Sequence, residues 1–318
     1  MREVHGAPAG PSRRRAVRLS RSGYGGHRPS AGRLTRNGRT PVGYHVSSAG
    51  GIRKAVERAK LIGCDALQMF PSNPRSWALP GEQPSDDAGI RRYLNRIGFG
   101  PVFFHAPYLV NLASTDPEIQ EKSVSVMKFA LERAARCGAE GVVVHAGSHR
   151  GMDRTDGLEQ VARHTRALLA ESRVFKVIFE LTAGGGTPIA SLPDHACELA
   201  AAIGRTGRVR FCIDTQHLFA AGYPWHSRGG ISRLIAEIEG TIGLERIACI
   251  HVNDSLAGFA SRHDRHQVIG RGEIGLAPFR RLLRSKELRG IPLILETPGE
   301  LEEHSDEVAL LRSLARAN

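Results

Sequence analysis

Long apolar runs are absent from this 318-residue sequence, and cysteine is scarce. No apolar stretch exceeds about half a dozen residues, which excludes a transmembrane helix of about 20 residues. The five cysteines are odd in number, scattered, and never spaced as CxxC. This pattern argues against a disulfide framework or a thiolate zinc finger and favours a reducing compartment. We therefore expect a cytoplasmic protein with no membrane contact.

Acidic residues are nearly missing from the first 40 residues, which hold ten arginines, no lysine and one glutamate. This segment carries +9 of the net charge of +12, so the rest of the chain is only mildly basic. It is rich in Gly, Ser and Pro and has no hydrophobic period, which predicts a disordered tail over residues 1–40. Three accounts of the tail stay open: a basic arm for phosphate backbones, an organelle-targeting peptide, or translation from an upstream start codon.

Residues 41–318 predict one globular domain. Short apolar runs rich in Val, Ile and Phe alternate there with longer segments of helical period. Eight such runs occur, at residues 42–46, 66–70, 102–105, 141–145, 177–180, 209–214, 247–252 and 293–296. Eight βα units in a chain of this length predict an α/β fold, a (β/α)8 TIM barrel. A doubly wound open sheet is the structural alternative.

Two helix boundaries are marked in the sequence. Apolar residues recur at helical spacing from Ile52, and Gly63 predicts the end of that helix. Asp116, followed by Pro117 and Glu118, is typical of a helix start with proline in the first turn.

Residues of the metal-ligand types end six of the eight expected strands: His105, His145, Glu180, Asp214, His251 and Glu296. Three more candidates lie just beyond strand ends: His217, Asp264 and His266. In a barrel the carboxyl ends of the strands converge on one mouth, where gathered carboxylates would repel each other and cations are the usual remedy. Nitrogen and oxygen donors favour zinc, with manganese or iron as alternatives, and nine donors indicate two or three ions sharing a bridging carboxylate.

Several long motifs resemble the endonuclease IV family, the zinc-dependent apurinic/apyrimidinic (AP) endonucleases. They follow the family's order over about residues 43–298 and include GYHVSSAGG (43–51), MFPSNPRSW (69–77), FFHAPYLVNLAS (103–114), CIDTQHLFAAGY (212–223) and SRHDRHQVIGRGEIG (261–275). The resemblance implies an enzyme that cuts duplex DNA on the 5′ side of an abasic site by metal-activated hydroxide. It would leave a 3′-hydroxyl and a 5′-deoxyribose phosphate, and it would also trim blocked 3′ ends.

The resemblance also implies three zinc ions and divides the nine donors among them. The first ion would be held by His105, His145 and Glu180. Glu180 would bridge to the second, held also by Asp214, His251 and Glu296. The third would be held by His217, Asp264 and His266. Glu180 would in addition orient the attacking hydroxide, which makes it the expected catalytic residue.

Three residues match family positions that enter the DNA stack or the minor groove at the lesion: Arg75, Tyr108 and Leu109. Inserting such side chains compensates for unstacking when the abasic nucleotide is flipped out.

The sequence departs from the family at Leu181, where asparagine is common, at Gln216, where cysteine is common, and at Ser255, where lysine is usual. These departures put the tuning of the site in doubt rather than its metal binding.

Two rival functions remain open at this point. Metal-dependent sugar isomerases and epimerases share the architecture and would use donors such as Glu180, Asp214, His251 and Glu296, but they do not need the other five. A nucleic-acid-binding protein that has lost catalysis is the second rival, although the intact donor set argues against it. We expect a monomer acting on nucleoid DNA, because a mouth that binds a duplex needs no partner subunit.

Overall fold

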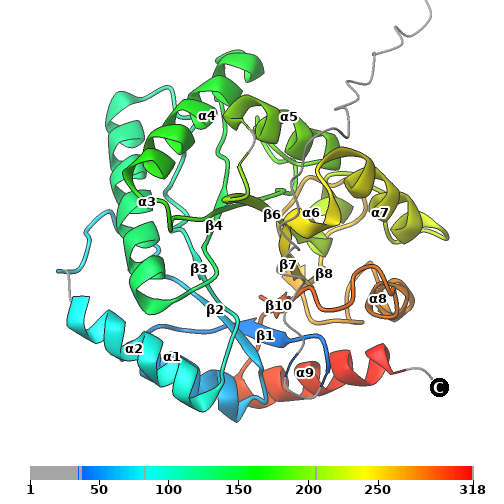
Figure 1. The fold of residues 1–318 in the computed structure, drawn as a ribbon. Coiled ribbons are helices and arrows are strands. Elements are labelled where there is room, and N and C mark those ends of the chain that lie inside the picture. The colour runs from blue at the N-terminus through cyan, green and yellow to red at the C-terminus, as the bar shows by residue number, and fades with distance from the viewer. Residues whose placement is uncertain (1–34, 36–37, 82–83, 205, 317–318) are drawn as a thin grey trace, which may run out of the picture.

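A closed barrel of eight parallel strands, surrounded by helices, forms the body of the protein (Figure 1). The computed structural model describes residues 35, 38–81, 84–204 and 206–316. The barrel strands are β1 (Val42–His45), β2 (Ala66–Met69), β3 (Val102–His105), β4 (Val142–His145), β5 (Val177–Glu180), β6 (Val209–Asp214), β7 (Ile247–His251) and β10 (Leu293–Leu295). Their order around the barrel is β1-β10-β7-β6-β5-β4-β3-β2. The predicted TIM barrel is confirmed, and the open-sheet alternative is wrong because β1 pairs with β10.

Helices connect the strands and cover the outside of the barrel. They are α1 (Ile52–Leu61), α2 (Pro84–Ile97), α3 (Pro117–Cys137), α4 (Arg154–Glu171), α5 (Pro193–Ile203), α6 (Thr215–Ala220), α7 (Gly230–Thr241), α8 (Leu276–Leu283) and α9 (Leu301–Ala315), with a 3-10 turn at Leu244–Arg246. Both marked boundaries are confirmed. Asp116 caps α3 by accepting the backbone N–H of Glu118 at 2.8 Å, and Gly63 follows α1 at a φ of +80° that favours glycine.

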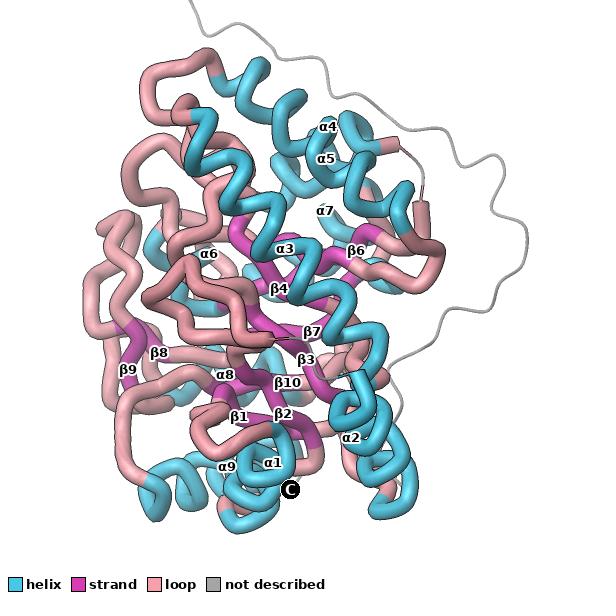
Figure 2. The backbone as a smooth tube through the Cα atoms, turned by 90° about the vertical axis from the view of Figure 1, so that its left-hand side faces the viewer, coloured by secondary structure: helices cyan, strands magenta, loops and turns pink. Residues whose placement is uncertain are grey.

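Two small elements were not expected from the sequence. Strands β8 (Asp254–Ser255) and β9 (His266–Gln267) form an antiparallel pair in the long connection after β7. Helix α6 follows β6 directly and comes before α7 in the same crossover. Figure 2 shows β8 and β9 beyond one end of the barrel, beside α6. These additions thicken the rim on the side where the strands end.

The two-residue alternation of the strands divides the interior into an apolar floor and a polar mouth. The floor is a separate buried cluster to which seven of the strands contribute: Ala66, Phe103, Val143, Ile178, Cys212, Ala248, Cys249 and Ile294. Two residues further along the strands, the inward side chains are polar: Gln68, His105, His145, Glu180, Asp214, His251 and Glu296. The intervening residues, such as Phe104 and Phe179, pack outward in the main core beneath the helices. Each polar residue of the mouth therefore lies directly above an apolar residue of the floor.

The remaining expectations about the chain ends fall largely outside this description. The predicted disordered tail over 1–40 lies outside the described residues, apart from residues 35 and 38–40. Within the described part of the chain, no helix combines the length and apolar character needed to cross a membrane.

Gly43 tests how tightly the barrel interior is packed. A Cβ on Gly43 would lie 2.6 Å from the backbone carbonyl carbon and oxygen of Ala66 on β2, which cannot move aside like a side chain. We expect Gly43→Ala to lower the free energy of unfolding by about 1–3 kcal/mol, as overpacking typically does. Gly240→Ala in α7 is the matched control, because its Cβ meets nothing within 4 Å, and it should be neutral or stabilising by up to about 1 kcal/mol. Urea unfolding measures both, and equal stability of the two variants would contradict the expectation.

Candidate metal centre at the barrel mouth

Three groups of side chains at the mouth are compact enough to hold a metal ion. Within each group, one ligand atom per residue lies within 4.8 Å of the others. The groups are His105 with His145 and Glu180; Glu180 with Asp214, His251 and Glu296; and Asp214 with His217 and His266. Glu180 belongs to two of the groups and Asp214 to two, so the three groups are joined. The barrel strand ends, together with α6 and β9, thus bring together eight of the nine predicted donors.

Asp264, the ninth predicted donor, lies beside the third group on the loop before β9. Its carboxylate oxygens lie 3.2 Å from Nε2 of His217 and 3.3 Å from Nε2 of His266. Asp264 is half exposed, whereas Asp214 and His217 are buried. The third group is therefore open to solvent on the Asp264 side.

Glu180 is the centre of the arrangement. Its carboxylate is buried and surrounded by imidazoles, with Oε2 lying 3.0 Å from Nε2 of His105 and 3.2 Å from Nε2 of His145. Its other oxygen, Oε1, lies 2.9 Å from Nδ1 of His251 and 3.2 Å from Nδ1 of His217. A carboxylate with both oxygens turned toward separate donor groups has the geometry needed to bridge two ions.

Backbone carbonyls fix the orientation of three histidines. Nδ1 of His105 donates to the carbonyl of Ala106 at 2.8 Å, and Nδ1 of His217 donates to the carbonyl of Leu181 at 3.0 Å. Nδ1 of His266 donates to the carbonyl of Glu296 at 3.2 Å. Since the proton then resides on Nδ1, each ring turns the Nε2 lone pair toward the mouth, as a metal-binding histidine does.

Unsatisfied nitrogen atoms test whether these residues fit a metal. The Nε2 atoms of His145, His217 and His266 are buried, and each lies 3.2–3.3 Å from a carboxylate oxygen without the geometry of a hydrogen bond. A buried polar atom without a partner is costly, so its presence at three neighbouring positions calls for an explanation. Nitrogen and carboxylate donors are the ligands that zinc takes in catalytic sites. The donor chemistry and the orphaned nitrogens therefore fit bound metal ions.

Opposite charges shift the pKa values of these groups in the metal-free protein. Burial alone would lower the pKa of His217, but the Asp214 and Asp264 carboxylates outweigh it and raise this pKa well above its ordinary value. Burial would raise the pKa of Glu180, yet His251 and His145 hold it well below its usual range. For His105, the hydrogen bond and the charge of Glu180 overcome burial and raise the pKa. Without metal, protons on His105 and His217 therefore help to balance the carboxylates.

Two buried amides that the sequence analysis did not select support the donors. Gln68 contacts Glu296 and His251 from within β2. Asn253 donates to Oδ2 of Asp214 at 2.7 Å and accepts the backbone N–H of Glu296 at 2.8 Å. A glutamine inside an apolar strand was the available signal for Gln68. Asn253 carried no comparable signal in the sequence.

Two of the three departures from the family contact each other. Nε2 of Gln216 donates to Oγ of Ser255 at 3.3 Å and to the carbonyl of His263 at 2.9 Å. Gln216 therefore ties α6 to the loop that carries Asp264. The third departure, Leu181, points its side chain into the core, and only its carbonyl serves the site, through His217.

The residues expected to meet DNA lie on the rim. A cavity of about 620 Å³ is lined by seven of the nine donors, all but Asp214 and His251, and also by Tyr108, Phe70 and Pro74. A second hollow of about 540 Å³ shares Tyr108 and is lined by Leu109. Tyr108 is 68% exposed and stands edge-on to the ring of Phe70, with ring centroids 5.1 Å apart. Arg75 is exposed on the loop after β2.

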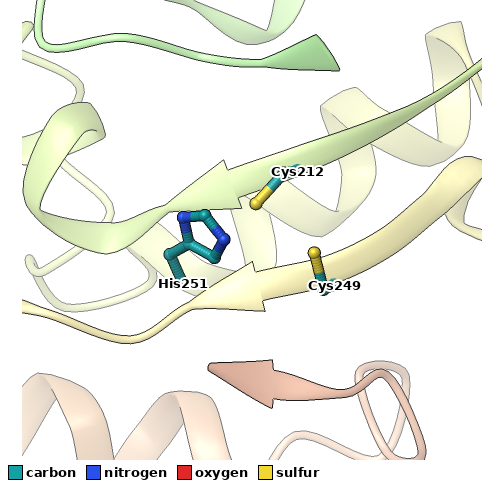
Figure 3. A group of neighbouring side chains, drawn as sticks. All are labelled: Cys212, Cys249 and His251. Carbon is teal, nitrogen blue, oxygen red and sulfur yellow. The ribbon is translucent and has the colours of Figure 1, made fainter. Parts of the chain in front are cut away.

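A fourth group has sulfur donors and lies one layer deeper. Cys212 on β6 and Cys249 on β7 are directly opposed in the strand register, and Figure 3 shows their sulfur atoms in the space between the two strands, beside His251. His251 can serve only one of its two groups. Its Nδ1 lies 2.9 Å from Glu180 and 3.0 Å from Glu296, and its Nε2 is hydrogen bonded to Gln68, so its contacts favour the carboxylate group.

Comparison with known proteins bears on this site. The family described as a xylose isomerase-like TIM barrel matches residues 56–314. The probable endonuclease 4 of Methanoculleus marisnigri is 40% identical over 281 residues, which cover 87% of this chain and 99% of the relative. That of Chloroflexus aurantiacus is 37% identical over 278 residues, covering 86% and 98%. The chain belongs to the endonuclease IV family.

Solved structures agree with this membership. Endonuclease IV from Thermus thermophilus superposes with a TM-score of 0.76 at 34% identity, over 86% of this chain and 98% of that one. A D-tagatose 3-epimerase-like protein also superposes, with a TM-score of 0.66. Its 18% identity shows a common fold alone. The resemblance drawn from the motifs is thereby confirmed.

Metal and protons compete for this site, so the metal-induced gain in stability should grow with pH. A histidine whose folded pKa exceeds the unfolded value of about 6.5 stabilises the fold below pH 6.5, and this contribution is lost as pH rises through the folded pKa. His105 and His217 behave this way in the metal-free protein. We expect the Tm of chelator-treated protein to fall as pH rises above about 6.5, while the Tm of metal-loaded protein changes less. Calorimetry measures both, and a Tm difference that narrows with rising pH would contradict the expectation.

Proposed function

We propose that this protein is a DNA-repair endonuclease that hydrolyses the phosphodiester bond 5′ to abasic sites in duplex DNA. The products are a 3′-hydroxyl and a 5′-deoxyribose phosphate, and blocked 3′ ends are further substrates. Residues 41–318 form the catalytic domain. The observation that carries the proposal is the linked set of donor groups around Glu180 at the mouth of the barrel.

The donors would hold three zinc ions. The first would be bound by His105, His145 and Glu180, the second by Glu180, Asp214, His251 and Glu296, and the third by His217, Asp264 and His266. Asp214 also lies in the third group, so it can contact that ion as well. Zinc bound here supplies a nucleophile from water at neutral pH and stabilises charge on the phosphate. Manganese or iron at some of these positions suits the same donors.

The protein's own residues position the reaction. Glu180 is held by four histidines, so its carboxylate has a fixed orientation toward a phosphate entering the mouth. Asp264 is the most exposed donor and reaches the mouth from a loop, which places it where the DNA backbone arrives. Buried walls beneath the mouth exclude bulk water from below, since the floor of the barrel is filled with apolar side chains.

Lesion recognition would use the rim. Tyr108 is exposed beside the donor cavity, and its ring can stack on a base next to the extruded abasic nucleotide. Leu109 and Arg75 would enter the gap in the duplex beside it. The mouth needs no partner subunit, so the working form is a monomer acting on DNA in the cytoplasm.

The sugar isomerase alternative is not favoured. Relatives named endonuclease 4 match nearly the whole body of the chain, whereas the epimerase-like structure shares only the fold. An isomerase also has no use for the separate donors His105, His145, His217 and His266 that the barrel brings to the same mouth.

Glu180→Gln tests the proposed chemistry. Glutamine keeps the size of the side chain but loses the charge and one metal-binding oxygen, so the joined sites should come apart. We expect incision of a duplex with one abasic-site analogue to fall at least about 100-fold. Zinc content measured on the same samples should fall from about three ions per chain in the wild type.

Glu159→Gln is the matched control, because Glu159 is exposed on α4 and pairs with exposed Arg166. It should cut like the wild type. A folded, zinc-loaded wild-type protein that leaves abasic DNA intact would overturn the proposed function, and sugar isomerisation would then be assayed.

Tyr108→Ala tests lesion recognition separately from chemistry. Base stacking on an aromatic side chain is worth about 1–3 kcal/mol. We therefore expect a KM or Kd for abasic duplex raised about 10-fold or more, with zinc content and Tm unchanged because the ring is exposed. Leu61→Ala on α1, an exposed apolar residue remote from the mouth, should leave binding unchanged. Wild-type affinity in Tyr108→Ala would remove this residue from the DNA interface.

A further inference from the structure

Gln68 is a buried polar residue to which the proposed chemistry gives no role. It lies in the middle of β2, in the otherwise apolar segment Ala66–Met69, and is fully buried. Burying an amide costs free energy unless its donor and acceptor atoms are both paired. Its partners therefore indicate why a glutamine stands at this position.

Both ends of the Gln68 amide meet expected metal donors. Its Oε1 accepts a hydrogen bond from Nε2 of His251 at 2.9 Å. Its Nε2 donates to Oε1 of Glu296 at 2.6 Å. His251 ends β7 and Glu296 directly follows β10, so one side chain on β2 reaches donors at the ends of two other strands.

The contact with His251 fixes which ring nitrogen is free. Because Nε2 carries the proton given to Gln68, the lone pair of the neutral ring lies on Nδ1. Nδ1 is the atom that faces Oε1 of Glu180 at 2.9 Å and Oε2 of Glu296 at 3.0 Å. The amide oxygen thus turns the ring toward the second donor group.

The contact between Gln68 and Glu296 gives the two carboxylate oxygens of Glu296 different partners. Oε1 is occupied by Gln68 and by Nδ1 of His45, which lies 2.9 Å away. Oε2 faces His251 and the second donor group. A carboxylate with one oxygen held by two donors presents the other in a fixed direction. A neutral amide can accept from an imidazole and donate to a carboxylate at the same time, without adding charge to the mouth.

We propose that Gln68 is a positioning residue that holds His251 and Glu296 in the geometry that binds the second metal ion. This inference rests on the proposed function, since it concerns one of the three metal positions named there. Outer partners of this kind typically change metal affinity by about 10–100-fold when removed. The effect should be confined to one ion, because neither His105 and His145 nor His217 and His266 contact Gln68 through a hydrogen bond in the described structure.

Gln68→Met tests the proposal, because methionine fills a similar volume without either hydrogen bond. The apoprotein is titrated with zinc against a chromophoric chelator. We expect one of three ions to bind about 10–100-fold more weakly, with the other two unchanged. The visible spectrum of the cobalt-substituted protein should lose the contribution of one site. Incision should recover partly when excess zinc is added.

Gln160→Met is the matched control. Gln160 is a glutamine on α4 whose amide donates to the carbonyls of Leu112 and Ser114, away from the donors. The zinc affinities of the Gln160→Met variant should equal those of the wild type. Gln68→Asn is the second variant, for the case that Gln68→Met does not fold. It keeps a polar amide in the barrel but is one methylene too short to reach both partners, so the same loss of affinity is expected.

One result would overturn this inference. A folded Gln68 variant would bind all three zinc ions with affinities within about threefold of the wild type, and its cobalt spectrum would be unchanged. Such a result would leave the proposed function intact, provided that the wild type binds zinc and cuts abasic DNA. Failure of the wild type to bind zinc or to cut would instead remove the proposed function, and this inference with it.

Discussion

Glu180 carries its charge where burial makes charge costly, and the mouth of the barrel is organised around that carboxylate. An unpaired ion in such a place costs several kcal/mol even after relaxation. Four histidines from β3, β4, β7 and α6 surround it at 2.9–3.2 Å. Three of them, His105, His217 and His251, are held in turn by a backbone carbonyl or by Gln68, so the orientation of these rings depends on a neighbour that is not itself a donor. Removing the central charge would leave His105 and His145 without the carboxylate that lies against both of them.

The barrel limits the cost of burying these polar groups by gathering them at one end of its interior. Strand alternation sends every second side chain inward, and the inward positions change from apolar to polar within two residues along each strand. Cys212 is followed by Asp214, Cys249 by His251, and Ile178 by Glu180. The apolar layer provides the packing that holds the strands in register. This register in turn fixes the positions of the polar side chains one layer above.

Much of the site could be predicted from the sequence because strand ends converge in a barrel. Residues such as His145 and Glu180 needed only the right strand boundaries, and these were correct to within a residue or two. Gln68 escaped notice because a single polar residue within a strand has no spacing partner in the sequence. Its importance depends on contacts with residues 183 and 228 positions away. The pairing of β8 with β9 was also beyond sequence reasoning, since two-residue strands carry no periodicity.

The contact between Gln216 and Ser255 couples two positions that are 39 residues apart. Gln216 is fully buried, and its amide nitrogen is shared between Ser255 and the carbonyl of His263. A larger or charged side chain at either position would have to be accommodated by the other, so the two departures from the family constitute one change rather than two. Introducing a family-typical residue at only one of the two positions would remove one partner of the hydrogen bond between them and leave the other in place.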